Sequence, residues 1–312
     1  MIPSYEFTVF TPTYNRAYII GKLYDSLKRQ TYRDFEWLVV DDGSSDNTEE
    51  LFAQIQQESD FPVRYIKVKN GGKHRAINIG VQNAKGKVFF VVDSDDYLRD
   101  DALEQIITAE RSIPRNTKVK YSGVRALRCY SDGSVIGEKF SDGDHIDLTQ
   151  LEEAKLGITG DKCEAFYIDV LKLFPFPEFE GENFLTECVV WDKIAASGYK
   201  NRCINEAVYI CEYLPDGLTA SVHERHRKNP KGSGLYIHQS IKYRKITGWS
   251  KRYTVLNYYH THSKNLSVHE IADNLHMGTA QLSMYIWWIN IRIYFRRKWK
   301  GIKRRLERDE NV

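Results

Sequence analysis

The stretch that most constrains the fold is an apolar run followed directly by a cluster of acids. Residues 88–92 read Val-Phe-Phe-Val-Val, and residues 93–96 read Asp-Ser-Asp-Asp. The run has the length and β-branched content of a buried strand, and continuous apolar strands are typical of parallel sheets covered by helices. Because an unpaired carboxylate is costly to bury, the strand should end at Val92. Its acids should then emerge at the carboxyl end, where open α/β sheets bind their ligands.

The acidic cluster has two readings. Asp93, Asp95 and Asp96 repel one another unless a cation lies between them, and oxygen ligands at this spacing suit Mg²⁺ or Mn²⁺. The alternative is a plain helix start, since aspartate caps helices and Asp96 could do only that.

The first hundred residues alternate between strand-like and helix-like segments. Strands are expected at 7–10, 35–40, 63–68 and 88–92, with helices at 19–27, at 48–57 and after Gly72. Pro12 should interrupt the first strand. Alternation at this interval predicts an α/β fold with right-handed crossovers and a mostly parallel sheet. Polar residues would then follow three strands at one edge, as in a nucleotide pocket with a metal.

Composition and missing motifs exclude several classes. The 312 residues carry a net charge of +3, which does not indicate nucleic-acid binding. The five cysteines form no CxxC pair, which argues against a disulfide framework or a zinc site. No GxGxxG follows the first strand and no GxxxxGK[ST] occurs, which disfavours a dinucleotide dehydrogenase and a P-loop NTPase. Neither a secretory leader nor an apolar run of about 18 residues is found, so a membrane span is not expected.

Four segments together resemble the family-2 glycosyltransferases, which have the Rossmann-like GT-A fold. They are Thr-Pro-Thr-Tyr-Asn-Arg at 11–16, Val-Val-Asp-Asp-Gly-Ser-Ser-Asp at 39–46, Ala-Lys-Gly at 84–86, and the acids at 93–96. The resemblance is strongest over residues 5 to about 110 and weaker to about 220. It implies an inverting, metal-dependent hexosyltransferase that uses Mn²⁺ or Mg²⁺. The donor would be a nucleotide-diphosphate sugar, with UDP the usual nucleotide, and the acceptor a glycan hydroxyl in surface polysaccharide biosynthesis.

The resemblance also implies roles for individual residues. Pro12, Tyr14 and Asp42 would contact the nucleoside, with Asp42 accepting from the base or ribose.

The acids would form the DxD motif of the family. Asp93 would lie nearer the ribose, with Ser94 beside it on the donor. Asp95 would hold the metal, and Asp96 could share in either role.

Lys73 and Arg75 follow a Gly-Gly pair near a predicted helix start. They could neutralise the donor diphosphate, and the glycines would permit a close backbone approach. The alternative is that both are solvated charges.

Glu187 opens a predicted helix with Val190, Trp191 and Ile194 on its buried face. The family usually carries Glu-Asp here, and the acid serves as the general base. In this chain Glu187 matches, but Cys188 stands in place of the aspartate. Glu187 could also be only a favourable anion in the first helical turn.

The chain is expected to divide into a GT-A catalytic domain at 1–220 and a basic, helical extension at 221–312. The basic stretch at 223–234, broken by Pro and Gly, could be a lid that supplies a metal-binding His223 or His226. It could equally be a solvated loop.

The C-terminal tail combines aromatic residues with a basic cluster. Ser267 and Glu270 resemble a capping box, and the helix that they open could run through Leu282. Nine Lys or Arg occur at 292–308, against the single acid Glu307. Trp and Tyr beside such a cluster favour a helix in the interface of an anionic membrane. The protein would then be cytoplasmic, peripheral at the inner membrane face, with a lipid-linked glycan acceptor. A helix packed on the domain and an RNA-binding helix are the alternatives.

Two other functions remain open at this point. A nucleotidyltransferase should carry a glycine-rich and basic loop after the first strand, whereas residues 12–15 read Pro-Thr-Tyr-Asn. An inactive glycan-binding homologue is compatible with Cys188.

Overall fold

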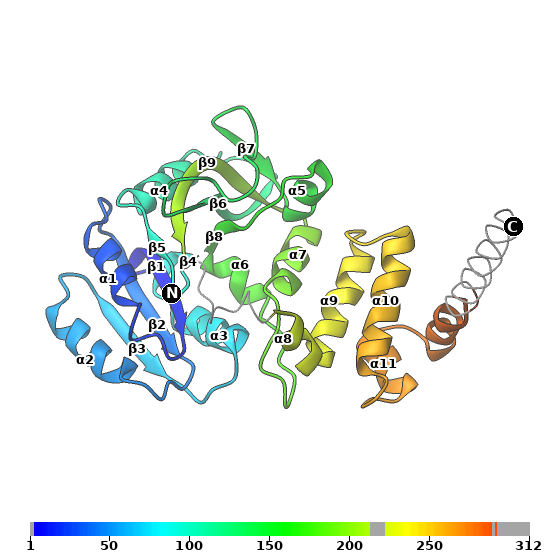
Figure 1. Ribbon diagram of the computed structural model, residues 1–312. Helices are drawn as coiled ribbons and strands as arrows, with labels where there is room; N and C mark the ends of the chain where they lie inside the picture. The colour runs from blue at the N-terminus through cyan, green and yellow to red at the C-terminus, as the bar shows by residue number, and fades with distance from the viewer. Residues whose placement is uncertain (1–2, 213–221, 289–290, 292–312) are drawn as a thin grey trace, which may run out of the picture. The chain divides into compact units, whose positions relative to one another are not determined.

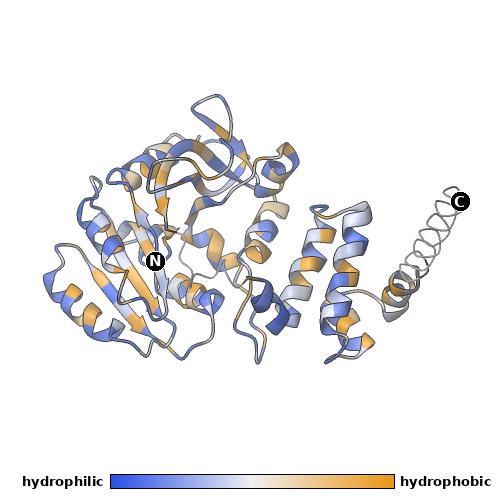
Figure 2. Ribbon diagram, in the orientation of Figure 1, coloured by the Kyte–Doolittle hydropathy of each residue, from blue (hydrophilic) through white to orange (hydrophobic). Residues whose placement is uncertain are grey.

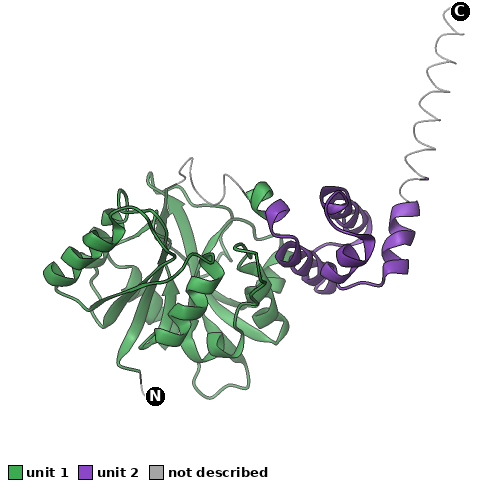
Figure 3. Cartoon of the chain, turned by 90° about the horizontal axis from the view of Figure 1, so that it is seen from below, with its two compact units in different colours: residues 1–225 green, residues 226–312 purple. Residues whose placement is uncertain are grey.

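The computed structural model describes residues 3–212, 222–288 and 291 (Figure 1). The chain forms two compact units, residues 1–225 and residues 226–312 (Figure 3).

Unit 1 is built on a mixed sheet that has nine strands within the described residues. Their order is β3-β2-β1-β4-β8-β6-β9-β5, and β7 also pairs with β9. The first four strands of this order pair in parallel, as the sequence predicts, and β8 then adds antiparallel to β4. The strands are β1 (Tyr5–Thr13), β2 (Phe35–Asp41), β3 (Val63–Lys67), β4 (Gly86–Val91), β5 (Tyr97–Leu98), β6 (Lys120–Tyr130), β7 (His145–Leu148), β8 (Lys162–Tyr167) and β9 (Tyr199–Cys211).

Helices cover both faces of this sheet, and its central strands β1, β2 and β4 are therefore largely buried and rich in apolar residues (Figure 2). On one face, Leu23 of α1, Phe52 of α2 and Ile106 of α4 pack with Trp37 and other strand residues in one core. On the other face, α3 contacts β1 and β2, and α6 contacts β4. The helices of this unit are α1 (Gly21–Lys28), α2 (Thr48–Glu58), α3 (Lys73–Asn83), α4 (Ala102–Arg111), α5 (Gln150–Leu156), α6 (Ile168–Leu173) and α7 (Cys188–Ala196).

Pro12 does not interrupt the first strand, contrary to the sequence-based expectation. β1 continues to Thr13, with Pro12 opposite Val40 of β2. On its other side, β1 pairs with β4 only as far as Phe10, whose carbonyl accepts from the Val92 N–H at 2.8 Å. Along a strand, the backbone hydrogen-bonding groups of successive residues point alternately to the two neighbouring strands. The backbone nitrogen of Pro12 therefore points to the same side as that of Phe10, but it lies beyond the end of β4. The missing proline N–H therefore costs no hydrogen bond of the ladder.

Unit 2 is helical. Its core contains Ile237, Val255, Ile271 and Leu282, each at most 9% exposed. A further helix covers residues 279–288. The others are α8 (Val222–Lys228), which crosses the boundary between the units, α9 (Pro230–Lys242), α10 (Gly248–His262) and α11 (Val268–Asn274).

The basic stretch at 223–234 is helical rather than a loop. Pro230 lies in the first turn of α9, where a missing N–H is tolerated. A Cβ on Gly234 would lie 2.4 Å from the Asn274 carbonyl oxygen, so this glycine lets α9 pack closely on α11. His226 Nδ1 lies 2.9 Å from Ser233 Oγ. A lid or metal-binding role for His223 or His226 stays a prediction.

The capping box of α11 is confirmed, but the helix is shorter than expected. Ser267 Oγ accepts from the Glu270 N–H at 3.3 Å, and Glu270 Oε2 accepts from the Ser267 N–H at 2.8 Å. The helix ends at Asn274 because His276 has a φ of +49° and the Met277 N–H bonds back to the Ala272 carbonyl at 3.0 Å.

Within the described ranges, every helix is too short or too polar to span a bilayer. The basic cluster at 292–308 lies outside the described residues.

Candidate functional site

The loops that follow β1 and β2 are joined by hydrogen bonds. The Asn15 N–H donates to Ser44 Oγ at 2.8 Å, and the Ser45 N–H donates to Asn15 Oδ1 at the same distance. Asn15 has a φ of +53°, a conformation that asparagine tolerates better than most residues. The neighbouring Tyr14 is 47% exposed, so its ring is available to a ligand at this edge of the sheet.

Asp42 anchors the loop that leads into α3. Its buried carboxylate accepts from the N–H groups of Gly71 and Gly72 at 2.7 and 2.8 Å. Burial raises the pKa of Asp42, and these two backbone hydrogen bonds oppose the rise. Gly72 has a φ of +99°, and a Cβ there would lie 1.9 Å from the Asn183 carbonyl oxygen, so only glycine fits. The contact of Asp42 with a nucleoside stays a prediction.

Lys73 brings together two residues that the sequence assigns to different roles. Its Nζ lies 2.6 Å from Asp93 Oδ1 and 2.8 Å from Glu187 Oε1. Lys73 is the first residue of α3, Asp93 follows β4, and Glu187 is the N-cap of α7. These side chains are 22%, 24% and 33% exposed, so the group is partly enclosed but open to a ligand.

The electrostatics of this group follow from its geometry. Burial disfavours the charge on Lys73, but attraction to Asp93 and Glu187 outweighs burial and raises the lysine pKa. Burial likewise opposes the charge on Asp93, but Lys73 and then Arg128 hold its pKa below the usual range. The ion pairs therefore keep Lys73 and Asp93 in their charged forms.

Asp95 and Asp96 both have raised pKa values. Burial, followed by repulsion from Asp93, raises the pKa of Asp96 to about 7. The same two causes raise the pKa of Asp95. Asp96 also accepts from the Glu212 N–H at 2.9 Å. Ser94, between these acids, is buried.

Arg128 is a cation of this site that the sequence analysis missed. Its guanidinium nitrogen NH1 lies 4.0 Å from Asp93 Oδ2 and 3.9 Å from Asp96 Oδ2. The guanidinium also stacks 4.2 Å from the centre of the Tyr209 ring, whose hydroxyl accepts from the Asp93 N–H. The available signal was an arginine between the apolar residues Leu127 and Cys129 of β6.

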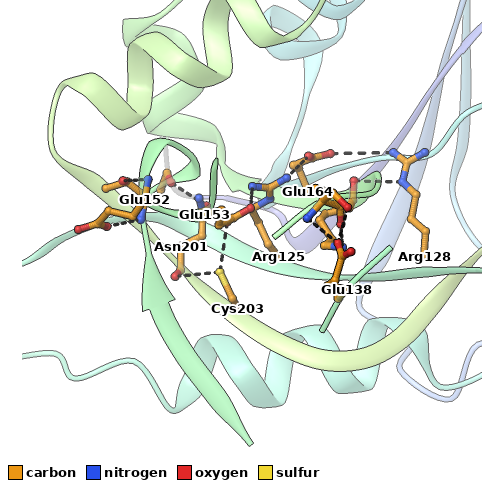
Figure 4. Close-up of polar contacts among 12 residues, drawn as sticks. Arg125, Arg128, Glu138, Glu152, Glu153, Glu164, Asn201 and Cys203 are labelled. Atoms are coloured by element: carbon orange, nitrogen blue, oxygen red, sulfur yellow. Dashed lines mark hydrogen bonds and ion pairs between the residues drawn. The ribbon is translucent and has the colours of Figure 1, made fainter. Parts of the chain in front are cut away.

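Arg128 also contacts Glu164, which belongs to a buried network of charged side chains (Figure 4). Glu164 lies 3.9 Å from Arg128 and 3.0 Å from Arg125, and Arg125 pairs with Glu153 at 2.5 Å. Arg125 and Glu153 are each 6% exposed. Each of these four charged side chains lies beside one of opposite charge. The network can therefore fix the position of Arg128 without leaving a buried charge uncompensated.

The guanidinium of Arg75 is hydrogen-bonded to backbone carbonyls. Its guanidinium donates at 2.7 Å to each of the carbonyls of Gly71, Phe179 and Glu182, and its Nε pairs with Glu178 at 3.2 Å. These contacts give Arg75 a structural task beside the Gly71–Gly72 loop. Its role toward a donor diphosphate stays a prediction.

The acids suit a hard divalent cation in chemistry. Across the described ranges, no three His, Cys, Asp or Glu side chains gather into a ready-made metal-binding group. Burial, followed by repulsion from Asp93, nevertheless disfavours the charged forms of Asp95 and Asp96, and a bound cation would relieve both effects. Carboxylate oxygens in such a place fit Mn²⁺ or Mg²⁺.

Sequence comparison finds that the first third of the chain matches a known family. The Glycosyl transferase family 2 model matches residues 8–113. Glycosyltransferase GlyA of Streptococcus pneumoniae serotype 4 is 36% identical over 106 residues, which are 34% of this chain and 15% of that protein. Poly(ribitol-phosphate) beta-N-acetylglucosaminyltransferase TarS of Staphylococcus aureus is 33% identical over 101 residues, 32% of this chain and 18% of that protein. The chain thus covers less than a fifth of these two relatives.

Solved structures share the fold over most of the chain. S. aureus TarS 1–349 in complex with UDP-GlcNAc has a TM-score of 0.59 at 18% identity, covering 85% of this chain and 77% of that one. The mannosyltransferase PcManGT of Pyrobaculum calidifontis, in complex with GDP-Man and Mn²⁺, has a TM-score of 0.52 at 18% identity, covering 94% and 86%. Residues 8–113 therefore match glycosyltransferase family 2, within a chain that has the GT-A fold.

Proposed function

We propose that this chain is an inverting, metal-dependent glycosyltransferase that moves a sugar from a nucleotide-diphosphate donor to a hydroxyl of a glycan acceptor in surface polysaccharide biosynthesis. The observation that carries the proposal is the bridge of Lys73 between Asp93 and Glu187, which joins the expected donor side and the expected base. UDP is the nucleotide that we favour, because the TarS neighbour binds UDP-GlcNAc. The family match favours glycosyl transfer over nucleotidyl transfer.

Each residue of the bridge has a task in this reaction. The ammonium of Lys73 would bind the donor diphosphate, since it already lies among carboxylates at the first turn of α3. Glu187 would accept the proton of the acceptor hydroxyl as that oxygen attacks the anomeric carbon. The remaining oxygen ligands, Asp95 with Asp93 or Asp96, would hold Mn²⁺ or Mg²⁺, and the bound ion would neutralise charge on the departing diphosphate.

Cys188 does not remove the base that we propose. It is the first residue of α7, directly after Glu187, and it is half-buried. The contact with Lys73 is made by Glu187 itself, so the proposed proton transfer needs no acid at position 188.

The lipid-linked acceptor and the peripheral location at the inner membrane face are also proposals. They rest on the nine basic residues at 292–308. No nucleic-acid partner is proposed.

The proposal is tested by donor binding and by transfer with purified protein. A thermal-shift panel of UDP-, GDP- and dTDP-sugars with Mn²⁺ should identify the donor. Glu187→Gln should then lower the rate of transfer by about 100-fold or more while donor binding is retained, because a general base contributes about that factor or more. Asp95→Asn should remove the effect of Mn²⁺ on donor binding. Glu206→Gln, at a carboxylate that is 49% exposed, is the matched control. Full metal-dependent transfer by Asp95→Asn would refute the metal role.

A further inference from the structure

Unit 2 carries large apolar side chains on its surface. On α10, Trp249 is 54% exposed and Tyr253 is 71% exposed. On the helix at 279–288, Met284 and Trp287 are each 62% exposed and Trp288 is 37% exposed. The spacing is i, i+4 in the first helix and i, i+3, i+4 in the second, so each set lies on one helix face.

The two sets form one surface, which we call the aromatic face. The rings of Trp249 and Trp288 lie 5.4 Å apart. Arg252 lies over both of them, 5.2 Å from the centre of the Trp249 ring and 4.3 Å from that of Trp288. Val255 and Leu282, from the same two helices, are fully buried in the core of unit 2. Among the described residues, these helices thus contribute other side chains to the core and leave the aromatic face exposed, and an exposed apolar patch of this kind marks an interaction site.

The charge of unit 2 restricts what can bind this face. Without the tail, residues 226–291 contain 9 Lys and Arg against 2 Asp and Glu, a formal net charge of +7. Residues 1–225 carry 27 Lys and Arg against 37 Asp and Glu, a formal net charge of −10. No acid occurs between Glu224 and Glu270, a stretch that includes all of α10. The partner of such a unit should be anionic.

We propose that the aromatic face is a docking surface for an anionic lipid bilayer. Trp and Tyr side chains favour the membrane–water interface because one end of each ring is apolar and the other is polar. Arg252 and the cations of unit 2 would meet the anionic headgroups. A nucleic acid would use the cations, but it would gain little from Met284. The proposal concerns folded helices and is separate from both the basic tail at 292–308 and the proposed activity.

The test is binding of the full-length chain to vesicles, without sugar donor or acceptor. Vesicles of equal parts phosphatidylcholine and phosphatidylglycerol are compared with phosphatidylcholine alone by co-sedimentation. The triple variant Trp249→Ser, Trp287→Ser, Trp288→Ser keeps every charge, including the tail. It should bind at least about tenfold more weakly, since each lost ring removes apolar area from the lipid contact. Arg252→Glu should weaken binding about fivefold or more, because each basic residue at an anionic surface contributes about that factor.

The design also includes a control variant and a measurement of direct contact between tryptophan and lipid. Leu173→Ser removes an apolar side chain that is 64% exposed in unit 1 and should leave vesicle binding unchanged. Lipids with brominated acyl chains should quench the tryptophan fluorescence of the wild type, and the triple variant should lose most of that quenching. Circular dichroism and melting temperature establish that the variants are folded.

Four results would overturn the proposal. The first is wild-type protein that ignores anionic vesicles, and the second is a triple variant that binds them as the wild type does, which would leave the tail as the whole cause. The third is binding of the wild type to RNA that the triple variant loses while it keeps vesicle binding. The fourth is a dimer of the wild type that the triple variant dissolves, which would make a second copy the occupant.

Discussion

The substitution Lys73→Met tests whether one ammonium holds the site together. It leaves the carboxylates of Asp93 and Glu187, now 2.6 and 2.8 Å from Nζ, without their cation. Loss of one partner from a fully buried ion pair costs about 3–5 kcal/mol. Because the three side chains remain 22–33% exposed, water screens part of this loss, and we expect about 2–3 kcal/mol. For a domain of this size that corresponds to a fall in melting temperature of about 4–12 °C.

The dependence of this loss on pH identifies its cause. In the wild type the pKa of Asp93 is depressed, so its contribution to stability is present above the unfolded pKa and is lost as pH falls through the folded pKa. Without Lys73 the folded pKa rises, and protonation relieves the repulsion. The difference in unfolding free energy between variant and wild type should therefore be largest at pH 7 to 8 and should shrink toward pH 4.

Chemical denaturation across this pH range, followed by tryptophan fluorescence, measures the effect. The matched control is Lys22→Met, whose ammonium pairs with Glu212 at 2.6 Å but is 55% exposed. An exposed pair contributes about 0–1 kcal/mol, so the control should change stability little at any pH. Equal stabilities of Lys73→Met and wild type, with parallel pH profiles, would show that the bridge is not an energetic feature of the fold.

Two further predictions concern the residues on either side of Lys73. His74 is 2% exposed, and burial, followed by the charge of Arg75, lowers its pKa to about 4, so stability should fall as pH drops from about 6.5 to 4. His74→Gln should remove up to about 3 kcal/mol of that pH dependence in acid-denaturation curves, and an unchanged slope would refute the assignment. Gly72→Ala should cost more than Gly133→Ala in thermal melts: both have positive φ, but only at Gly72 would the new Cβ meet backbone, 1.9 Å from the Asn183 oxygen. Equal costs would show that the Asn183 contact relaxes freely.

The parallel half of the sheet could be predicted because its signal is local. The run at 88–92 is apolar along its whole length, and the acids after it can only emerge at the strand end. The sequence-based expectations were wrong where the local structure depends on a neighbouring segment of the fold. Pro12 remains in β1 because β4 has already ended beside it. The stretch at 223–234 is helical, and its Gly234 lets α9 lie close to Asn274 at the end of α11, a contact that no local pattern reveals.

The site was predicted as a set of residues but not as a set of contacts. Lys73 and Glu187 were each expected near a ligand, whereas the ion pair between them joins segments that are distant in the chain. Asp42 was expected to face a nucleoside, and its contacts with Gly71 and Gly72 became visible only in the fold. Arg128 was missed because its partners come from three other strands or strand ends.

The shared ammonium of Lys73 has a consequence for the order of events in the proposed reaction. While it rests between two carboxylates, the base is engaged with a cation and is poorly placed to deprotonate an acceptor. A phosphate group that draws the lysine toward itself frees Glu187 at the same moment. Such an enzyme would bind its donor before its acceptor. It would not deprotonate an acceptor hydroxyl while the donor site is empty.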